Sequence, residues 1–220
     1  MSITQNLNSV RNSIPEGVTL VAVSKTKPNE AIEEAYAAGQ RVFGENKVQE
    51  LVTKHETLPK DIEWHMIGHL QSNKVKYIAP FVHLIHGVDS LKLLKEINKQ
   101  GTKVNRVIDV LLQMHIAQEE TKFGLNKEEL YEILDKLNDF PNVAVKGLMG
   151  MATFTEDVSK IKQEFNHLKS TFEESKIHSN LSKDFKTISM GMSGDYKEAI
   201  ECGSTMVRVG SSIFGVRNYN

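Results

Sequence analysis

Hydrophobic positions along the chain alternate between short apolar runs and stretches with a helical period. The run VTLVAV at 18–23 is apolar or β-branched at every position, which is typical of a strand buried on both faces. Pro28 suits the first turn of the helix that follows, and Gly39 suits its end. Seven further apolar runs predict strands at 41–44, 62–68, 82–88, 106–114, 143–149, 187–190 and 206–210.

Between these runs the apolar residues recur every three or four positions, which predicts helices. Ser2 with Gln5, and Asn126 with Glu129, have the spacing of capping boxes at helix starts. Asp89 or Ser90 is expected to cap another helix. We expect helices at about 2–14, 28–38, 46–55, 72–79, 90–100, 126–137, 158–172 and 195–202.

The strict alternation of eight strands with helices predicts parallel strands joined by helical crossovers. Eight such units indicate an α/β fold of the closed (β/α)₈ TIM-barrel type, although strand count alone leaves an open doubly wound sheet as the competitor. About ten residues follow the last strand, too few for a full outer helix. We therefore expect one domain over 1–220, with the helix at 2–14 packing on the outer ring.

The amino-acid composition disfavours several classes of protein. The 220 residues are 40% hydrophobic and 25% charged, as in an ordinary globular protein, and the formal net charge of -1 favours neither nucleic acid nor an anionic membrane as partner. The N-terminal stretch is polar, without the apolar segment of a secretory signal, and no apolar run reaches membrane-spanning length. The single cysteine, Cys202, excludes an internal disulfide. We expect a cytoplasmic protein with no nucleic-acid or membrane partner.

In a barrel of this type the chemistry lies where strands end and loops begin. Glycine and serine follow the last two predicted strands, in SMGMS and RVGSS. Backbone N–H groups of such loops bind a phosphate, so Ser193 and Ser211 are candidate phosphate residues. Each serine alone is equally typical of a helix N-cap, and that alternative stays open.

Lys25 ends the first strand. A strand-end lysine is ordinarily solvated, but closure of a barrel would set this one beside the last strand and near Arg208. Desolvation and the neighbouring cation would lower its pKa and favour the nucleophilic amine. A nucleophilic lysine near a phosphate cradle is what pyridoxal 5′-phosphate requires, with Arg208 facing the pyridine nitrogen. Schiff-base aldolases of phosphorylated sugars are the rival, although their lysine usually lies on a later strand.

Several long stretches of the chain closely resemble the pyridoxal phosphate homeostasis family, also called the proline synthase co-transcribed protein group. They are AVSKTKP, FGENKVQE, WHMIGHLQSNK, SMGMSGDYKEAI and GSTMVRVGSSIFG, and the resemblance runs over 21–215. It implies a single barrel similar to the N-terminal domain of alanine racemase, with pyridoxal 5′-phosphate held as a Schiff base. Two departures are Lys47, where an aromatic residue is common, and Ser211, where threonine is common.

The resemblance also implies the site residues. Lys25 matches the Schiff-base lysine, Ser193 the phosphate-binding serine, and Arg208 the arginine that faces the pyridine nitrogen. Gly210 and Ser211 match the glycine and hydroxyl residue after that arginine. The remaining positions expected around the cofactor, with less defined roles, are Asn46, His65, Met149 and Met192.

No metal site is expected from the sequence. His65 and His69 have the spacing of an HxxxH pair, but the segment crosses a strand end, so one helical face does not present both. No cysteine or carboxylate partner is evident from the pattern. We expect His83 and His86 to be structural.

Function divides into two main hypotheses. The first is a non-enzymatic protein that buffers or delivers pyridoxal 5′-phosphate, with apo-enzymes as transient recipients and a monomeric state. The second is a racemase-like enzyme. Racemases of this fold take an opposite acid–base group from a second domain, for which this chain has no residues left, and Arg208 at the pyridine nitrogen disfavours its protonation. We therefore expect no evident catalysis. A phosphosugar-binding barrel enzyme is a third hypothesis.

Overall fold

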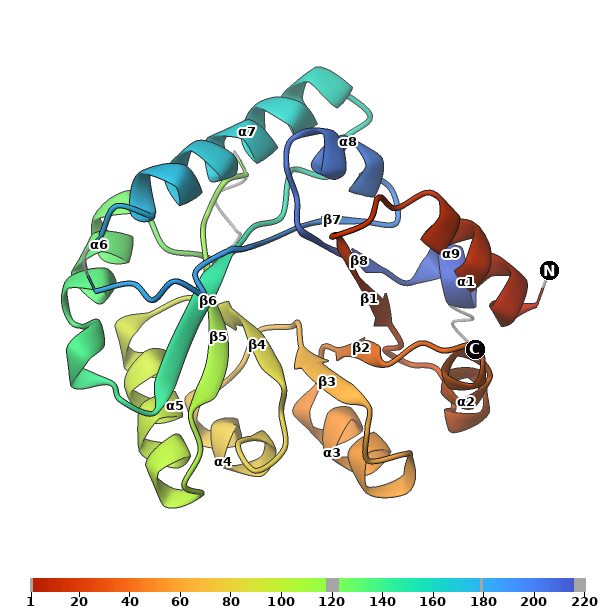
Figure 1. The fold of residues 1–220 in the computed structure, drawn as a ribbon, viewed down its shortest axis with the longest axis horizontal. Coiled ribbons are helices and arrows are strands. Elements are labelled where there is room, and N and C mark those ends of the chain that lie inside the picture. Colours follow the sequence, from red (N-terminus) through yellow and green to blue (C-terminus); the bar gives the residue numbers. More distant parts are fainter. Residues whose placement is uncertain (1, 118–122, 179, 216–220) are drawn as a thin grey trace.

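The computed structural model describes residues 2–117, 123–178 and 180–215, and its centre is a closed barrel of eight parallel strands (Figure 1). The strands are β1 (Thr19–Val23), β2 (Val42–Glu45), β3 (Glu63–Met66), β4 (Leu84–Val88), β5 (Ile108–Gln113), β6 (Val143–Met149), β7 (Thr187–Met192) and β8 (Met206–Val209). Pairing of β1 with β8, from Thr19 opposite Met206 to Ala22 opposite Val209, closes the barrel. The predicted TIM-type barrel is confirmed, and the open-sheet alternative is wrong.

Helices surround the barrel on its outside (Figure 1). Within the described residues they are α1 (Ile3–Asn12), α2 (Asn29–Ala37), α3 (Val48–Thr57), α4 (Val75–Ile78), α5 (Leu91–Lys103), α6 (Lys127–Asp135), α7 (Val158–Ser175), α8 (Tyr196–Glu201) and α9 (Ser211–Phe214). Short 3₁₀ turns occupy Ser72–Lys74 and Leu137–Asp139.

The predicted helix caps are present. Ser2 and Asn126 each form a complete capping box, with Gln5 and Glu129 as their partners. Ser90, rather than Asp89, caps α5, because its hydroxyl accepts a hydrogen bond from the N–H of Leu93. Residues close in sequence therefore satisfy backbone N–H groups at these helix starts.

The N-terminal helix α1 lies in the outer ring beside α9 and α2 (Figure 1). The Asn6 side-chain amide donates to the carbonyl of Ile213 at 3.1 Å, and the hydroxyls of Ser13 and Tyr196 are 2.8 Å apart. Since α9 has only four residues, α1 supplies the apolar cover that a full eighth helix would give.

Side chains of each strand alternate between the helices and the barrel interior. On β1, Ala22 packs in the large cluster between strands and helices, whereas Val21 belongs to a smaller interior cluster. The interior cluster also contains Leu84, Leu111, Met149 and Met206. None of the helices in the described ranges has the length and apolar character needed to cross a membrane.

Candidate cofactor-binding site

Lys25 lies two residues after the last residue of β1, at the end of the barrel where the strands finish. The alternation that turns Val21 inward and Ala22 outward continues to Ser24, whose buried hydroxyl donates to Glu45 Oε1 at 2.5 Å on the outer side. The next residue, Lys25, is partly buried and has the inward parity of the strand. This geometry favours a side chain directed to the barrel mouth.

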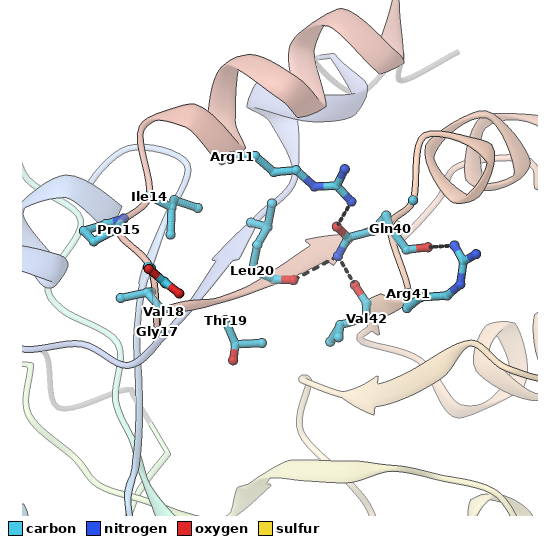
Figure 2. Close-up of a pocket in the computed structure, with 12 residues that line it drawn as sticks. Arg11, Ile14, Pro15, Gly17, Val18, Thr19, Leu20, Gln40, Arg41 and Val42 are labelled. Atoms are coloured by element: carbon cyan, nitrogen blue, oxygen red, sulfur yellow. Dashed lines mark hydrogen bonds between the residues drawn. The ribbon is translucent and has the colours of Figure 1, made fainter.

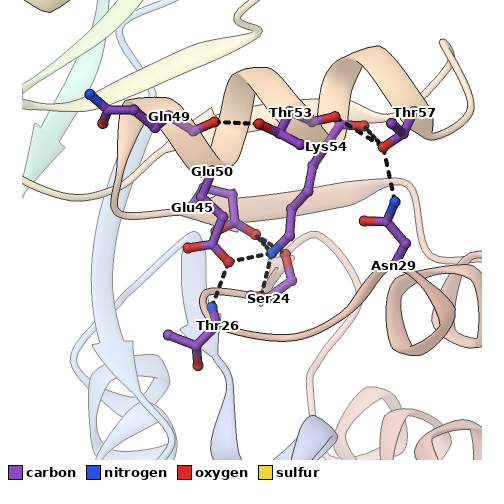
Figure 3. A network of polar contacts seen from close by, with 9 residues as sticks. All are labelled: Ser24, Thr26, Asn29, Glu45, Gln49, Glu50, Thr53, Lys54 and Thr57. Atoms are coloured by element: carbon purple, nitrogen blue, oxygen red, sulfur yellow. Dashed lines mark hydrogen bonds and ion pairs between the residues drawn. The ribbon is translucent and has the colours of Figure 1, made fainter.

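A buried ionic network fixes the backbone before Lys25 (Figure 3). The ammonium of Lys54, on α3, donates to the carbonyl of Ser24 at 2.9 Å, to Glu45 Oε1 at 2.8 Å and to Glu50 Oε1 at 2.6 Å. Lys54 is 4% exposed. Its three acceptors are therefore what compensates the loss of hydration of its charge.

The same network also holds the residue after Lys25. The N–H of Thr26 donates to Glu50 Oε1 at 2.6 Å, and Thr26 has a φ of 63°, a left-handed conformation uncommon for a β-branched residue. Ser24 and Thr26 are thus both tied to α3 through the Lys54 network. The sequence shows Lys54 only as a charged helix position four residues after Glu50, so its role was not predicted.

Burial raises the pKa of Glu45 to about 6, and the attraction of Lys54 with the hydrogen bonds from Lys54 and Ser24 acts in the opposite direction. Its Oε2 atom is buried and, among the described residues, accepts no hydrogen bond. The charged form of the Glu45 carboxylate is therefore destabilised by its burial.

The loops after β7 and β8 meet through Ser193. Its hydroxyl accepts a hydrogen bond from the N–H of Gly210 at 3.0 Å, whereas α8 has Asp195 at its N-cap position and no side-chain cap. The helix-cap alternative for Ser193 is therefore wrong. A Cβ at Gly210 would lie 3.1 Å from the carbonyl oxygen of Val23, so glycine allows the β8 loop to approach the end of β1.

These two loops leave backbone donors available. Within the described ranges, no acceptor is recorded for the N–H groups of Ser193, Gly194, Ser211 and Ser212. A Cβ at Gly194 would meet nothing within 4 Å, so the loop faces open space. Unpaired N–H groups on adjoining loops fit a phosphate, which needs several donors and no particular side chain.

Arg208 lies beneath this mouth, inside the barrel. Its Nη1 donates to the carbonyl of Ser189 at 2.9 Å and to the Ser189 hydroxyl at 2.6 Å, and its Nη2 donates to the carbonyl of Gly150 at 3.1 Å. Burial lowers its pKa to about 10, with Asp195 opposing the shift, so the guanidinium remains charged near neutral pH. These three bonds fix the orientation of the guanidinium. A guanidinium has five N–H donors in all, so Arg208 has more donors than these bonds use.

Asn46 follows β2, the strand paired with β1. Its side-chain oxygen Oδ1 is buried and has no hydrogen-bond partner among the described residues. An orphan acceptor beside the strand that bears Lys25 fits a site completed by a bound polar group. The structure thus brings Lys25, Asn46, Ser193, Gly210 and Ser211 to one end of the barrel, above Arg208.

Three other residues that were expected around the cofactor, Met149, Met192 and His65, have different environments. Met149 is 1% exposed in the interior cluster, and Met192 is 39% exposed at the end of β7. His65 is buried within the barrel, with its Nδ1 atom 2.9 Å from Nε2 of His86. It lines a cavity together with Thr19 at the start of β1, which is the end opposite Lys25.

Lys27 is the next lysine along the chain after Lys25. Its ammonium donates to the carbonyls of Phe214 at 2.9 Å and Gly215 at 3.2 Å. These are carbonyls at the end of α9, where a cation is stabilising. Lys27 therefore serves as a C-terminal cap of that helix.

A hollow of about 360 Å³ lies under α1 at the start of β1, away from the predicted site (Figure 2). Gln40 spans it by donating to the carbonyls of Leu20 and Val42 at 2.9 and 2.7 Å, and Arg11 donates to the Gln40 side-chain oxygen at 2.9 Å. The Gln40 side chain thus bonds to the backbone of β1 and β2 and to Arg11 of the N-terminal helix, which indicates a structural role.

The fold and the strand-end site define a class, the barrel of the alanine racemase N-terminal domain, whose family model matches residues 1–218. Alanine racemase from Bartonella henselae shares this fold at a TM-score of 0.73 and 16% identity, covering 97% of this chain and 58% of the racemase. Within that class, the chain belongs to the family of pyridoxal phosphate homeostasis proteins, because relatives of that name are 39% and 43% identical to it over 100% and 91% of its length.

Relatives with that name are similar over most of their length. The protein of Pasteurella multocida is 39% identical over 100% of both chains, and that of Aquifex aeolicus is 43% identical over 91% of this chain and 87% of its own. The structure of PipY from Synechococcus elongatus, solved with PLP bound, has a TM-score of 0.89 and 35% identity, covering 97% of this chain and 100% of PipY. The family predicted from the sequence is confirmed.

Proposed function

We propose that this protein binds pyridoxal 5′-phosphate through Lys25 and maintains the cellular supply of that cofactor by storing and releasing it. The observation that carries the proposal is the convergence of Lys25 with the joined β7 and β8 loops, where Ser193 accepts from Gly210 at 3.0 Å. When bound, the cofactor supplies an aldehyde that condenses reversibly with a neutral primary amine.

Each residue has a separate task in this proposal. The N–H groups of the β7 and β8 loops, with the Ser193 and Ser211 hydroxyls, bind the phosphate. Arg208, held by Ser189 and Gly150, presents a positive charge to the pyridine nitrogen. Lys54 holds the carbonyl of Ser24 directly and the N–H of Thr26 through Glu50, so the amine of Lys25 is positioned by a rigid support rather than by a free loop.

Storage rather than catalysis is favoured by the surroundings of the site. A racemase needs acid–base groups on both faces of its substrate. The barrel that this chain shares with the Bartonella racemase covers only 58% of that enzyme. A charged Arg208 at the pyridine nitrogen would keep that nitrogen unprotonated and weaken its withdrawal of electrons. We further propose that the protein acts as a monomer in the cytoplasm and that apo-enzymes are its transient recipients.

The test is covalent labelling. Purified protein is incubated with pyridoxal 5′-phosphate, reduced with borohydride and digested, and the modified peptide is identified by mass spectrometry. We expect one label, on Lys25, and its loss in Lys25→Ala. Lys27→Ala is the matched control, because it removes an ammonium two residues away that caps α9 and should retain the label. Labelling of Lys27, or a full label in Lys25→Ala, would contradict the proposal.

A further inference from the structure

A second cluster of chemically capable side chains lies at the opposite end of the barrel. It lines a cavity of about 330 Å³ formed around the starts of the strands. Glu63, His65 and His83 each offer one ligand atom here, and these atoms lie within 4.8 Å of one another. Nε2 of His83 is 3.4 Å from Oε2 of Glu63, and the imidazoles of His65 and His83 are parallel, with centroids 5.5 Å apart.

His65 is the buried member of this cluster, and one of its ring nitrogens is available to bind a ligand. It is 2% exposed, its Nδ1 contacts His86, and its Nε2 has no hydrogen-bond partner in the part of the chain that the structure describes. Burial lowers the pKa of His65 to about 3, with His83 adding to the shift, so the ring is neutral at physiological pH. A neutral imidazole with one nitrogen unpaired next to a carboxylate is a preferred ligand of transition metals.

The contacts behind His65 suit a metal ligand as well. A ligating histidine donates its other ring N–H to a fixed acceptor, which sets the tautomer. Here Nδ1 of His65 is 2.9 Å from Nε2 of His86, and Nδ1 of His86 is 3.0 Å from the hydroxyl of Ser189. With protons assigned to both Nδ1 atoms, each ring donates along this chain and Nε2 of His65 keeps its lone pair for the cavity.

We propose that Glu63, His65 and His83 form a binding site for a divalent transition metal ion of the Zn²⁺ class. Two histidines and one carboxylate are a set that leaves a fourth tetrahedral position for water or a small ligand from the cavity. Zinc–ligand bonds of about 2.0–2.1 Å place ligand atoms roughly 3.3 Å apart, and Glu63 and His83 are already at 3.4 Å. Their side chains are 46% and 52% exposed, which leaves them free to close on the buried His65.

The charge of the cavity is compatible with a cation. Two lysines line it, Lys146 and Lys186, against the carboxylates of Glu63, Asp109 and Asp184. The ammonium of Lys146 lies 3.6 Å from both Asp109 and Asp184, which neutralise it from two sides. Glu63 therefore supplies a carboxylate that Lys146 does not pair with among the described contacts.

The test uses the untagged full-length protein after dialysis against a chelator. Co²⁺ is titrated while the visible absorption of tetrahedral cobalt is followed, and Zn²⁺ binding is measured by calorimetry. We expect one ion per chain. His83→Ala and Glu63→Gln, both at exposed positions, are expected to weaken binding at least tenfold. His69→Ala is the matched control, because this exposed histidine pairs with Asp89 and lies outside the cluster.

Retention of the wild-type affinity in both His83→Ala and Glu63→Gln would overturn the proposal, as would the absence of saturable binding by wild type. His65→Ala leaves a space within the barrel, so its thermal unfolding is measured first. The two exposed-site variants decide the question independently of that result. The readout does not involve pyridoxal 5′-phosphate, so failure here leaves the proposed function unaffected.

Discussion

Glu45 offers a test of the buried network that supports Lys25. Its side chain is fully buried, one oxygen is bonded to Lys54 and Ser24, and the other has no partner within the described residues. The perturbation is Glu45→Gln, which keeps the shape of the side chain and removes its titration. The quantity compared is the difference in unfolding free energy between wild type and this variant as a function of pH.

The magnitude follows from the raised pKa. Burial raises the pKa of Glu45 to about 6 in the folded protein, above its ordinary value of 4.5. Between these values the folded state binds more protons than the unfolded state, so stability falls as pH rises. A pKa that is higher by about 1.5 in the folded protein corresponds to about 2 kcal/mol of unfolding free energy. Wild type should therefore lose about 2 kcal/mol relative to Glu45→Gln as pH rises through this window, and no more above it.

The assay is urea unfolding, followed by fluorescence of Trp64, at a series of pH values between about 4 and 7. Glu56→Gln, at an exposed position of α3, the helix that bears Lys54, controls for the loss of one negative charge. A flat difference curve would show that the pKa of Glu45 is not raised by folding. A curve that rises with pH would show that Lys54 outweighs burial and that Glu45 is stabilised in its charged form.

Two further predictions concern the cofactor site. Ser193→Ala removes the acceptor of the Gly210 N–H and a hydroxyl donor to the phosphate, and Ser211→Ala removes a second donor. Each loss of roughly 1.5 kcal/mol should weaken pyridoxal 5′-phosphate binding about tenfold and change pyridoxal binding little, as measured by equilibrium dialysis; equal losses for both ligands would place the phosphate elsewhere. We also expect only trace α-proton exchange when the loaded protein meets L-alanine in deuterated water, followed by NMR, since acid–base groups contribute about 10²–10⁴-fold each. Inversion at ordinary enzymatic rates, lost in Lys25→Ala, would establish a racemase instead.

Much of the fold was predictable because its signals are local. The apolar runs identified all eight strands, and the boundary errors are a few residues, as at α3, which begins at Val48 rather than near Asn46. The capping residues Ser2 and Asn126 act on N–H groups three positions away, so short sequence patterns suffice to find them.

The candidate site was predictable in part for the same reason. Lys25, Ser193 and Arg208 lie at the ends of recognisable strands, and the barrel gathers strand ends whatever the intervening sequence. Their neighbours were not predictable. Ser193 looked as much like a helix cap as a loop partner until its 3.0 Å contact with Gly210, seventeen residues away, was known.

Sequence alone thus determined the order of strands and helices, the family, and which residues stand at strand ends. Tertiary structure decided which of those residues meet. Closure by β1 with β8 joins residues almost two hundred positions apart, and it alone distinguishes a barrel from an open sheet. The contact of Lys54 on α3 with Ser24 after β1, and that of His83 with His65 on the neighbouring strand, likewise depend on how separate segments pack. Periodicity records which face a side chain occupies, whereas its partner across the fold is set by register and packing between distant segments.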